Sequence, residues 1–136
     1  MVKFPFLALP GKKGKVIYKP SIPVSLVFRK THVVTSRIYA LIDTGADVCF
    51  CNKNIGVFLR VNFVNKPVEY FKAANDQKFP AQKEQIRVYL GNTQVDCPFY
   101  FTDALPRTTP IILGEKGFLN RFKVTFDYPN KAIQLE

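Results

Sequence analysis

Large apolar residues recur at every second position in several parts of the chain, and this period of two predicts β-strands. Across 22–28 the even-numbered residues are all apolar, which gives a strand one face for a core. Residues 29–36 turn the chain back, and residues 37–42 form the partner strand of a hairpin. The same alternation over 86–101, on both sides of a turn at Gly91, predicts a second hairpin.

Shorter apolar runs, separated by turn-forming residues, predict the remaining elements. The further predicted strands cover 48–51, 68–72, 78–80, 111–113, 124–127 and 132–135. Asn52 is a suitable N-cap for a helical turn over 55–59. Phe118, Leu119 and Phe122 share one face of a short C-terminal helix. The pattern therefore predicts a mainly β protein with little helix.

The composition is typical of one globular domain over 1–136, in which the mixed residues 1–20 form an N-terminal arm. Apolar residues make up 47% of the chain, which is enough for a core at this length. No apolar run approaches the length of a membrane span. The segment 4–10 is too short and too rich in proline for a signal peptide. We therefore expect a cytoplasmic protein with no membrane partner.

The net charge of +10 raises the question of nucleic-acid binding. The basic residues are scattered from Lys3 to Lys131, and only the segment 11–19 concentrates them. No zinc-finger, RNA-recognition or helix-turn-helix pattern accompanies the charge. A solvated basic surface is therefore the better interpretation. A basic β-barrel that binds single strands through its aromatic residues stays as an alternative.

The cysteines and the single histidine do not form a recognisable metal motif. Cys49, Cys51 and Cys97 are an odd number, which argues against a disulfide framework. The Cys49-Phe50-Cys51 pair has no second pair, and His32 is the only histidine, so four ligands are hard to assemble. We interpret the cysteines as packed thiols and His32 as a loop residue, and we expect no metal and no cofactor.

The clearest chemical signal is Asp43-Thr44-Gly45, which follows the apolar strand 37–42. Gly45 lets the backbone bend tightly and approach a ligand. The Thr44 hydroxyl can both donate and accept hydrogen bonds at the strand end. The three-residue motif alone would occur by chance in roughly 3% of chains of this length. Its apolar flanks make it more specific.

Farther along, Pro110-Ile111-Ile112-Leu113-Gly114 forms a second apolar strand that ends in glycine. Together the two segments resemble the retropepsin-like aspartic proteases, the single-domain relatives of retroviral proteases, in order and spacing over residues 22–135. The resemblance implies a closed, barrel-like acid-protease fold in which the second strand runs beside the one that carries Asp43. It also implies that Asp43, Thr44 and Gly45 are the catalytic motif of an aspartic endopeptidase.

The resemblance further implies a second subunit and a peptide site. A lone carboxylate is a poor base at neutral pH, and this chemistry needs two carboxylates that share one proton. Since the chain contains one Asp-Thr-Gly, the resemblance implies a homodimer with Asp43 of each copy at the two-fold axis. A mobile hairpin, the flap, would close over a peptide or protein substrate. The substrate-binding residues implied are Ala46, Asp47, Ala73, Ala74, Asn75, Asp76, Thr109 and Ile112.

Two features depart from retroviral proteases. The flap contains no glycine, since none occurs between residues 57 and 90. Glu115-Lys116-Gly117 stands where many relatives carry an arginine that pairs with the aspartate equivalent to Asp47, so this ion pair is either rebuilt or absent. Both departures favour an alternative, a catalytically silent module for dimerisation or peptide binding. The intact Asp43 motif opposes it, because a silent module has little physical need for that carboxylate.

Overall fold

The structure, a computed structural model, describes residues 1–136 as mainly β. The strands are β1 (Val2–Pro5), β2 (Leu7–Pro10), β3 (Val16–Lys19), β4 (Ser21–Phe28), β5 (Val33–Val34), β6 (Ile38–Ile42), β7 (Cys49–Asn52), β8 (Val68–Lys72), β9 (Lys78–Leu90), β10 (Thr93–Thr102), β11 (Ile111–Leu113), β12 (Val124–Asp127) and β13 (Ala132–Leu135). The helices are α1 (Lys53–Phe58) and two 3-10 turns, η1 (Lys12–Gly14) and η2 (Leu119–Arg121). The predicted strands are confirmed, and those over 78–80 and 86–90 are parts of one long strand, β9.

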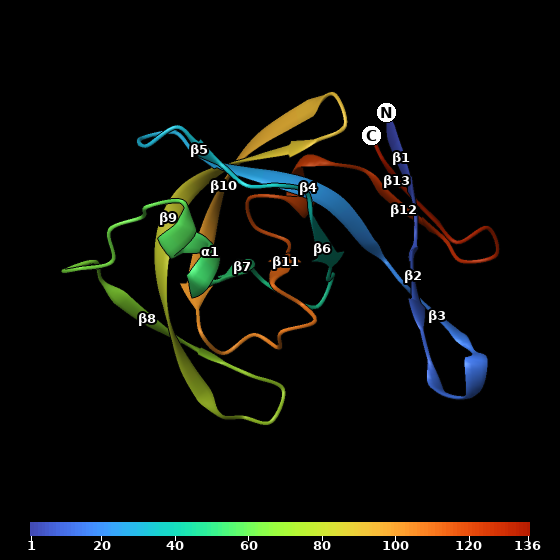
Figure 1. The fold of residues 1–136 in the computed structure, drawn as a ribbon, viewed down its shortest axis with the longest axis horizontal. Helices are drawn as coiled ribbons and strands as arrows, with labels where there is room; N and C mark the ends of the chain where they lie inside the picture. The colour runs from blue at the N-terminus through green and yellow to red at the C-terminus, as the bar shows by residue number, and fades with distance from the viewer.

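Six strands close into a barrel (Figure 1). Their order is β4-β6-β11-β7-β10-β9, and β9 pairs with β4 to complete the circle. Strand β11 runs parallel to β6 and antiparallel to β7. A late segment of the chain is thus inserted between two strands that are neighbours in sequence. This insertion places the Ile111–Leu113 strand beside the one that ends at Asp43, as the resemblance implied.

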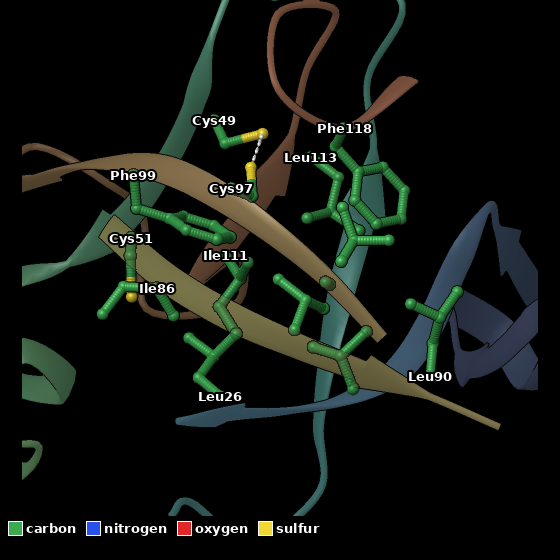
Figure 2. Close-up of a cluster of buried hydrophobic side chains, with 14 of the residues drawn as sticks. Leu26, Cys49, Cys51, Ile86, Leu90, Cys97, Phe99, Ile111, Leu113 and Phe118 are labelled. Atoms are coloured by element: carbon green, nitrogen blue, oxygen red, sulfur yellow. Dashed lines mark hydrogen bonds between the residues drawn. The ribbon is translucent and has the colours of Figure 1, made fainter. Parts of the chain in front are cut away.

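Alternate residues of the barrel strands point inward and form one apolar core (Figure 2). Leu26, Phe99, Ile111 and Leu113 are fully buried in it. Burial of side chains this large contributes about 1.5–3 kcal/mol each relative to exposure. Because successive residues of a strand point to opposite faces, the core also determines which residues face outward. The outward positions matter for the site described below.

The predicted N-terminal arm over 1–20 forms strands. Strand β1 pairs with β13 in the three-stranded sheet β1-β13-β12, so the two chain ends lie close together (Figure 1). Strands β2 and β3 pair only with each other, and their hairpin projects from the body. None of the helices has the length and apolar character that a membrane crossing requires.

The prediction of one short C-terminal helix is wrong in position and extent. The α-helix of the chain is α1, which begins after Asn52, as the helical turn expected over 55–59 suggested. The Asn52 side chain caps it by accepting a hydrogen bond from the Asn54 N–H at 2.8 Å. Near the C-terminus only η2 forms. Gly117 has a φ of 93° and Phe122 is already extended, so the intervening residues are too few for an α-helix.

Candidate active site

Asp43 lies directly after β6, half-buried, and hydrogen bonds hold both its backbone and its carboxylate. Its N–H donates to the Leu113 carbonyl of β11 at 3.0 Å. Its own carbonyl accepts from the Ala46 N–H at 3.2 Å, which closes the turn through Thr44 and Gly45. The Gly45 N–H donates to Asp43 Oδ1 at 2.9 Å. The turn therefore fixes the direction of the carboxylate before any ligand arrives.

The segment after the turn passes directly over Gly114. A Cβ on residue 114 would lie 2.7 Å from the Ala46 carbonyl oxygen and would also meet the backbone of Val48. Two hydrogen bonds hold the crossing: the Glu115 N–H donates to the Ala46 carbonyl and the Lys116 N–H to the Asp47 carbonyl, both at 2.9 Å. Only glycine fits this close approach of two backbones. The glycine at the end of the second apolar strand thus leaves room for the segment that follows Asp43.

Beside Asp43, an apolar row crosses four neighbouring strands on the outer face of the barrel. Ile112 pairs with Leu41 on one side and with Phe50 on the other, and Phe50 pairs with Tyr100. Their strand neighbours Ala40, Ile42, Cys49, Cys51, Ile111, Leu113, Phe99 and Phe101 are buried in the barrel. Asp43 follows Leu41 by two residues and therefore points to the same face as the row. The carboxylate thus borders an apolar surface.

Strands β8 and β9 form the hairpin to which the resemblance assigns the flap, and its tip, residues 73–77, is exposed. At the tip, the Ala73 N–H donates to the Gln77 carbonyl at 2.9 Å and the Asp76 N–H to the Ala73 carbonyl at 3.0 Å. Asp76 adopts a φ of 63°, which gives the turn its tight bend without glycine. An aspartate tolerates this left-handed conformation better than most residues do. The turn therefore forms although the tip contains no glycine.

Four aromatic residues join this hairpin to the apolar row close to the hairpin tip, since Phe71 pairs with Phe79 one position before the strands end. We call Phe50, Phe71, Phe79 and Tyr100 the aromatic clamp. Phe71 lies edge-on to Phe50 and to Tyr100, with ring centroids 5.1 and 4.9 Å apart. Phe79 lies 5.5 Å from Phe50 and stacks on Phe71 at 6.0 Å. Burial, and then the nearby Glu69 carboxylate, raises the pKa of the Tyr100 phenol. The clamp therefore packs the hairpin, close to its tip, against the outer face of the barrel.

The structure brings part of the predicted site together at adjacent strand ends. The segment 43–47 and Ile112 meet where β6 and β11 end, and Thr109 lies in the loop that leads into β11. Ala46, Thr109 and Ile112 are half-buried, whereas Thr44, Asp47 and the tip residues 73–76 are exposed. The sequence analysis missed the aromatic clamp. A signal for part of it exists, because Phe50 and Tyr100 alternate with buried residues and so must face outward.

The ion pair sought at Asp47 is not formed within the chain. The ion pairs present involve only the carboxylates of Asp96 and Glu84. Asp47 instead contributes its backbone carbonyl to Lys116, and its side chain stays exposed. Backbone hydrogen bonds across Gly114 therefore hold this loop without an arginine.

The three cysteines are buried and free, which confirms that they are packed thiols. The Cys97 Sγ–H donates to Cys49 Sγ at 3.4 Å, behind the strands of the site (Figure 2). The Gly114 N–H also reaches Cys49 Sγ, at 3.3 Å. The contact with Cys97 lowers the pKa of Cys49, and the same contact together with burial raises the pKa of Cys97. Burial raises the pKa of Cys51. His32 is exposed in its loop, and no three metal-binding side chains gather.

Solved structures show the same architecture, although no protein-family model and no curated protein matches the chain. A retropepsin-like aspartic protease from Rickettsia conorii aligns over 98% of each chain, with a TM-score of 0.62 at 14% identity. The retroviral protease-like domain of Ddi1 from Leishmania major aligns over 88% of this chain and 90% of that one, with a TM-score of 0.60 at 15% identity. EIAV protease, solved in complex with the inhibitor HBY-793, aligns over 78% and 88%, with a TM-score of 0.51 at 14% identity.

The closed barrel, the inserted strand β11 and the turn at Asp43 together define the class of fold. The chain has the retropepsin-like fold, and the resemblance read from the Asp43 and Gly114 segments is confirmed at the level of fold.

Proposed function

We propose that this protein is an aspartic endopeptidase whose active form is a homodimer. The observation that carries the proposal is the position of Asp43. Its carboxylate is held by the Gly45 N–H at 2.9 Å at the border of the apolar row formed with Ile112. The retropepsin-like fold supports the same reading. Because the chain has one Asp-Thr-Gly turn, the second carboxylate comes from Asp43 of a second copy across a two-fold axis.

The proposed chemistry belongs to the pair of Asp43 residues. Two carboxylates a few ångströms apart cannot both ionise at low cost, so the pair holds one proton. The ionised carboxylate takes a proton from a water between the two, and the water oxygen attacks the scissile carbonyl carbon. The protonated carboxyl gives its proton to the carbonyl oxygen. Proton transfer to the amide nitrogen then breaks the C–N bond, and the pair titrates as a unit.

The proposed substrate is an extended peptide that lies beside Asp43 and Ile112, at the end of the apolar row that the clamp leaves open, below the flap. Extended peptides bind such sites through main-chain hydrogen bonds and side-chain pockets. Backbone groups near Gly45 and Asp47 would hold it from below, and the flap tip 73–76 from above. Ala46, Thr109 and Ile112 would line apolar pockets for its side chains. We therefore expect cleavage of unfolded or extended protein segments.

The test pairs the solution mass with cleavage of a mixed peptide library between pH 3.5 and 7. Wild type is compared with Asp43→Asn and with Asp127→Asn, a matched change at an aspartate whose carboxylate contacts only Asn130 in the β12–β13 turn. We expect a dimer that cleaves peptides, loss of cleavage in Asp43→Asn, and full cleavage in Asp127→Asn. Cleavage that survives Asp43→Asn, or a monomer that cleaves, would contradict the shared pair. A dimer that binds peptides without cleaving them would establish the silent module instead.

A further inference from the structure

The β2–β3 hairpin has an apolar face that is largely exposed. The strand register sets Ala8 opposite Tyr18 and Pro10 opposite Val16, so these residues share one face. We call these four residues the hairpin face. Val16 is 53% exposed and Tyr18 47%, and Ala8 and Pro10 are exposed as well. Apolar side chains gathered on one projecting element are typical of an interaction surface.

The hairpin has little support of its own. Its two strands pair only with each other, and an isolated two-stranded hairpin is marginally stable in water. Towards the body, Lys131 Nζ lies 5.5 Å from the centroid of the Tyr18 ring, and Ala8 lines a hollow with Pro23 and Tyr39. A partner that covers the hairpin face would therefore stabilise both the interface and the hairpin itself.

The charges around the hairpin are all of one sign. Residues 1–42 contain no Asp or Glu, and the hairpin tip carries Lys12, Lys13 and Lys15. The strand ends near Asp43 carry charges of both signs, because Lys116 is exposed beside two carboxylates. Asp47 and Glu115 are exposed there and make no ion pair within the chain. One end of the molecule thus offers carboxylates that match the lysines of the hairpin.

The position of the hairpin fits a contact with a second copy. Figure 1 shows the β2–β3 hairpin and the β8–β9 flap extending from the barrel toward the same side, the lower edge of the view, with the strands β6 and β11 between them. A second copy that supplied its Asp43 to the site would approach this side. The projecting hairpin would then reach along the surface of that copy.

We propose that the β2–β3 hairpin is a dimerisation arm that packs its hairpin face on a second copy of this chain. The lysines of its tip then lie near the carboxylates beside the catalytic turn of that copy. The inference rests on the proposed homodimer. Two-fold symmetry repeats the contact, so each dimer contains two arms. An anionic lipid surface would satisfy the lysines, but it would leave the carboxylates near Asp43 unpaired and the catalytic pair unassembled.

The first test is sedimentation equilibrium of wild type and the double variant Val16→Ser/Tyr18→Ser. The matched control is Val57→Ser/Phe58→Ser on α1, where the two side chains are 61% and 60% exposed. We expect the dimer dissociation constant to rise at least tenfold in the hairpin variant and to stay unchanged in the control. Circular dichroism melts of both variants verify that the barrel remains folded.

A charge variant tests the second part of the contact. Lys12→Glu, Lys13→Glu and Lys15→Glu combined should weaken the dimer, and added salt should weaken the wild-type dimer because it screens exposed ion pairs. In the charge variant, salt should no longer weaken the dimer. A wild-type dissociation constant that is independent of salt, together with a charge variant that dimerises normally, would remove the charge pairing from the proposal.

Peptide cleavage separates a failure of the arm from a failure of the proposed function. We expect the hairpin variant to lose activity at low enzyme concentration and recover it at high concentration, whereas Asp43→Asn stays inactive but dimeric. A hairpin variant with the wild-type dissociation constant would overturn the arm and leave the catalytic pair intact. A wild type that is monomeric and inactive at every concentration would overturn both. Hairpin variants that lose binding to anionic vesicles or single-stranded oligonucleotides, with dimerisation unchanged, would also overturn the arm.

Discussion

Gly114 lies directly beneath the carbonyl of Ala46, where a Cβ would come within 2.7 Å of the carbonyl oxygen. The second apolar strand and the turn at Asp43 are therefore in backbone contact, and the hydrogen bond from the Glu115 N–H to the Ala46 carbonyl at 2.9 Å continues that contact. A glycine that looks like a mere strand terminator in the sequence is thus a requirement of the turn that presents Asp43.

We expect Gly114→Ala to destabilise the fold by about 1–3 kcal/mol, as overpacking does when backbone atoms must shift. Gly45→Ala is the matched control, because a Cβ there meets only Asp43 Oδ1, at 3.3 Å. The φ of Gly45 lies outside the left-handed region, so Gly45→Ala should reduce the free energy of unfolding much less than Gly114→Ala does. Urea unfolding of both variants measures the difference. Equal free energies of unfolding for the two variants would mean that the loop moves away from residue 114 at little cost.

The sequence predicted the strands and the turn at Asp43 because both depend on local patterns. The alternation over 22–28 and the Asp43-Thr44-Gly45 turn can each be recognised within a few residues. The closure of the barrel could be predicted only from the family resemblance, because the pairing of β4 with β9 joins segments that are far apart in the chain. The predicted C-terminal helix does not form. The spacing of the apolar residues Phe118, Leu119 and Phe122 is equally compatible with a short 3-10 turn that packs on the core.

The aromatic clamp escaped prediction for a different reason. Phe50 and Phe71 come from different strands, and their contact at 5.1 Å depends on how far the hairpin folds over the barrel. No short-range pattern specifies that angle. The sequence analysis noted that this hairpin lacks glycine, and the clamp adds packing contacts between the same hairpin and the barrel.

We expect Phe71→Ala to loosen the flap. The change removes a half-buried ring that contacts Phe50 and Tyr100, and aromatic pairs contribute about 0.5–1.5 kcal/mol each beyond their buried area. Amides of β8 and the adjoining part of β9 should exchange hydrogen faster. Tyr70→Ala is the matched control, because the Tyr70 side chain is 69% exposed on the other face of β8. If Phe71→Ala left exchange in this hairpin at the wild-type rate, the clamp would not hold the flap.

The three thiols should be protected in the native protein. Cys49, Cys51 and Cys97 are buried. Burial raises the pKa of Cys51, and the contact with Cys49 together with burial raises the pKa of Cys97, whereas the contact with Cys97 lowers the pKa of Cys49. Thiolates are the reactive form, so the protection of Cys49 rests on its burial alone. We expect an aromatic disulfide reagent to label all three thiols in urea and none in native buffer on the same timescale. Fast labelling of one thiol in native buffer would show that the barrel opens locally at that strand.

Lys66 and Glu84 provide a prediction about pH. Lys66 Nζ lies 2.8 Å from Glu84 Oε2, and the two side chains are only 21% and 11% exposed. Burial alone raises the pKa of Glu84, but the hydrogen bonds from Lys66 and from the Gln85 N–H outweigh it, so the net pKa lies below its usual value. A lowered folded-state pKa contributes stability above the unfolded pKa of about 4.3. That stability is lost as the pH falls through the folded-state value.

We therefore expect Glu84→Gln to reduce the free energy of unfolding by about 1–2 kcal/mol at pH 7, as loss of a charged hydrogen bond does. The difference from wild type should shrink as the pH falls from 5 toward 3, because wild-type Glu84 then becomes neutral as well. Glu136→Gln, at the exposed C-terminus, serves as the control and should show no such trend. Urea unfolding of wild type and both variants at each pH measures these differences in the free energy of unfolding. A difference that stays constant down to pH 3 would mean that the two residues contribute through packing, and that the ion pair does not anchor the loop after α1 to β9.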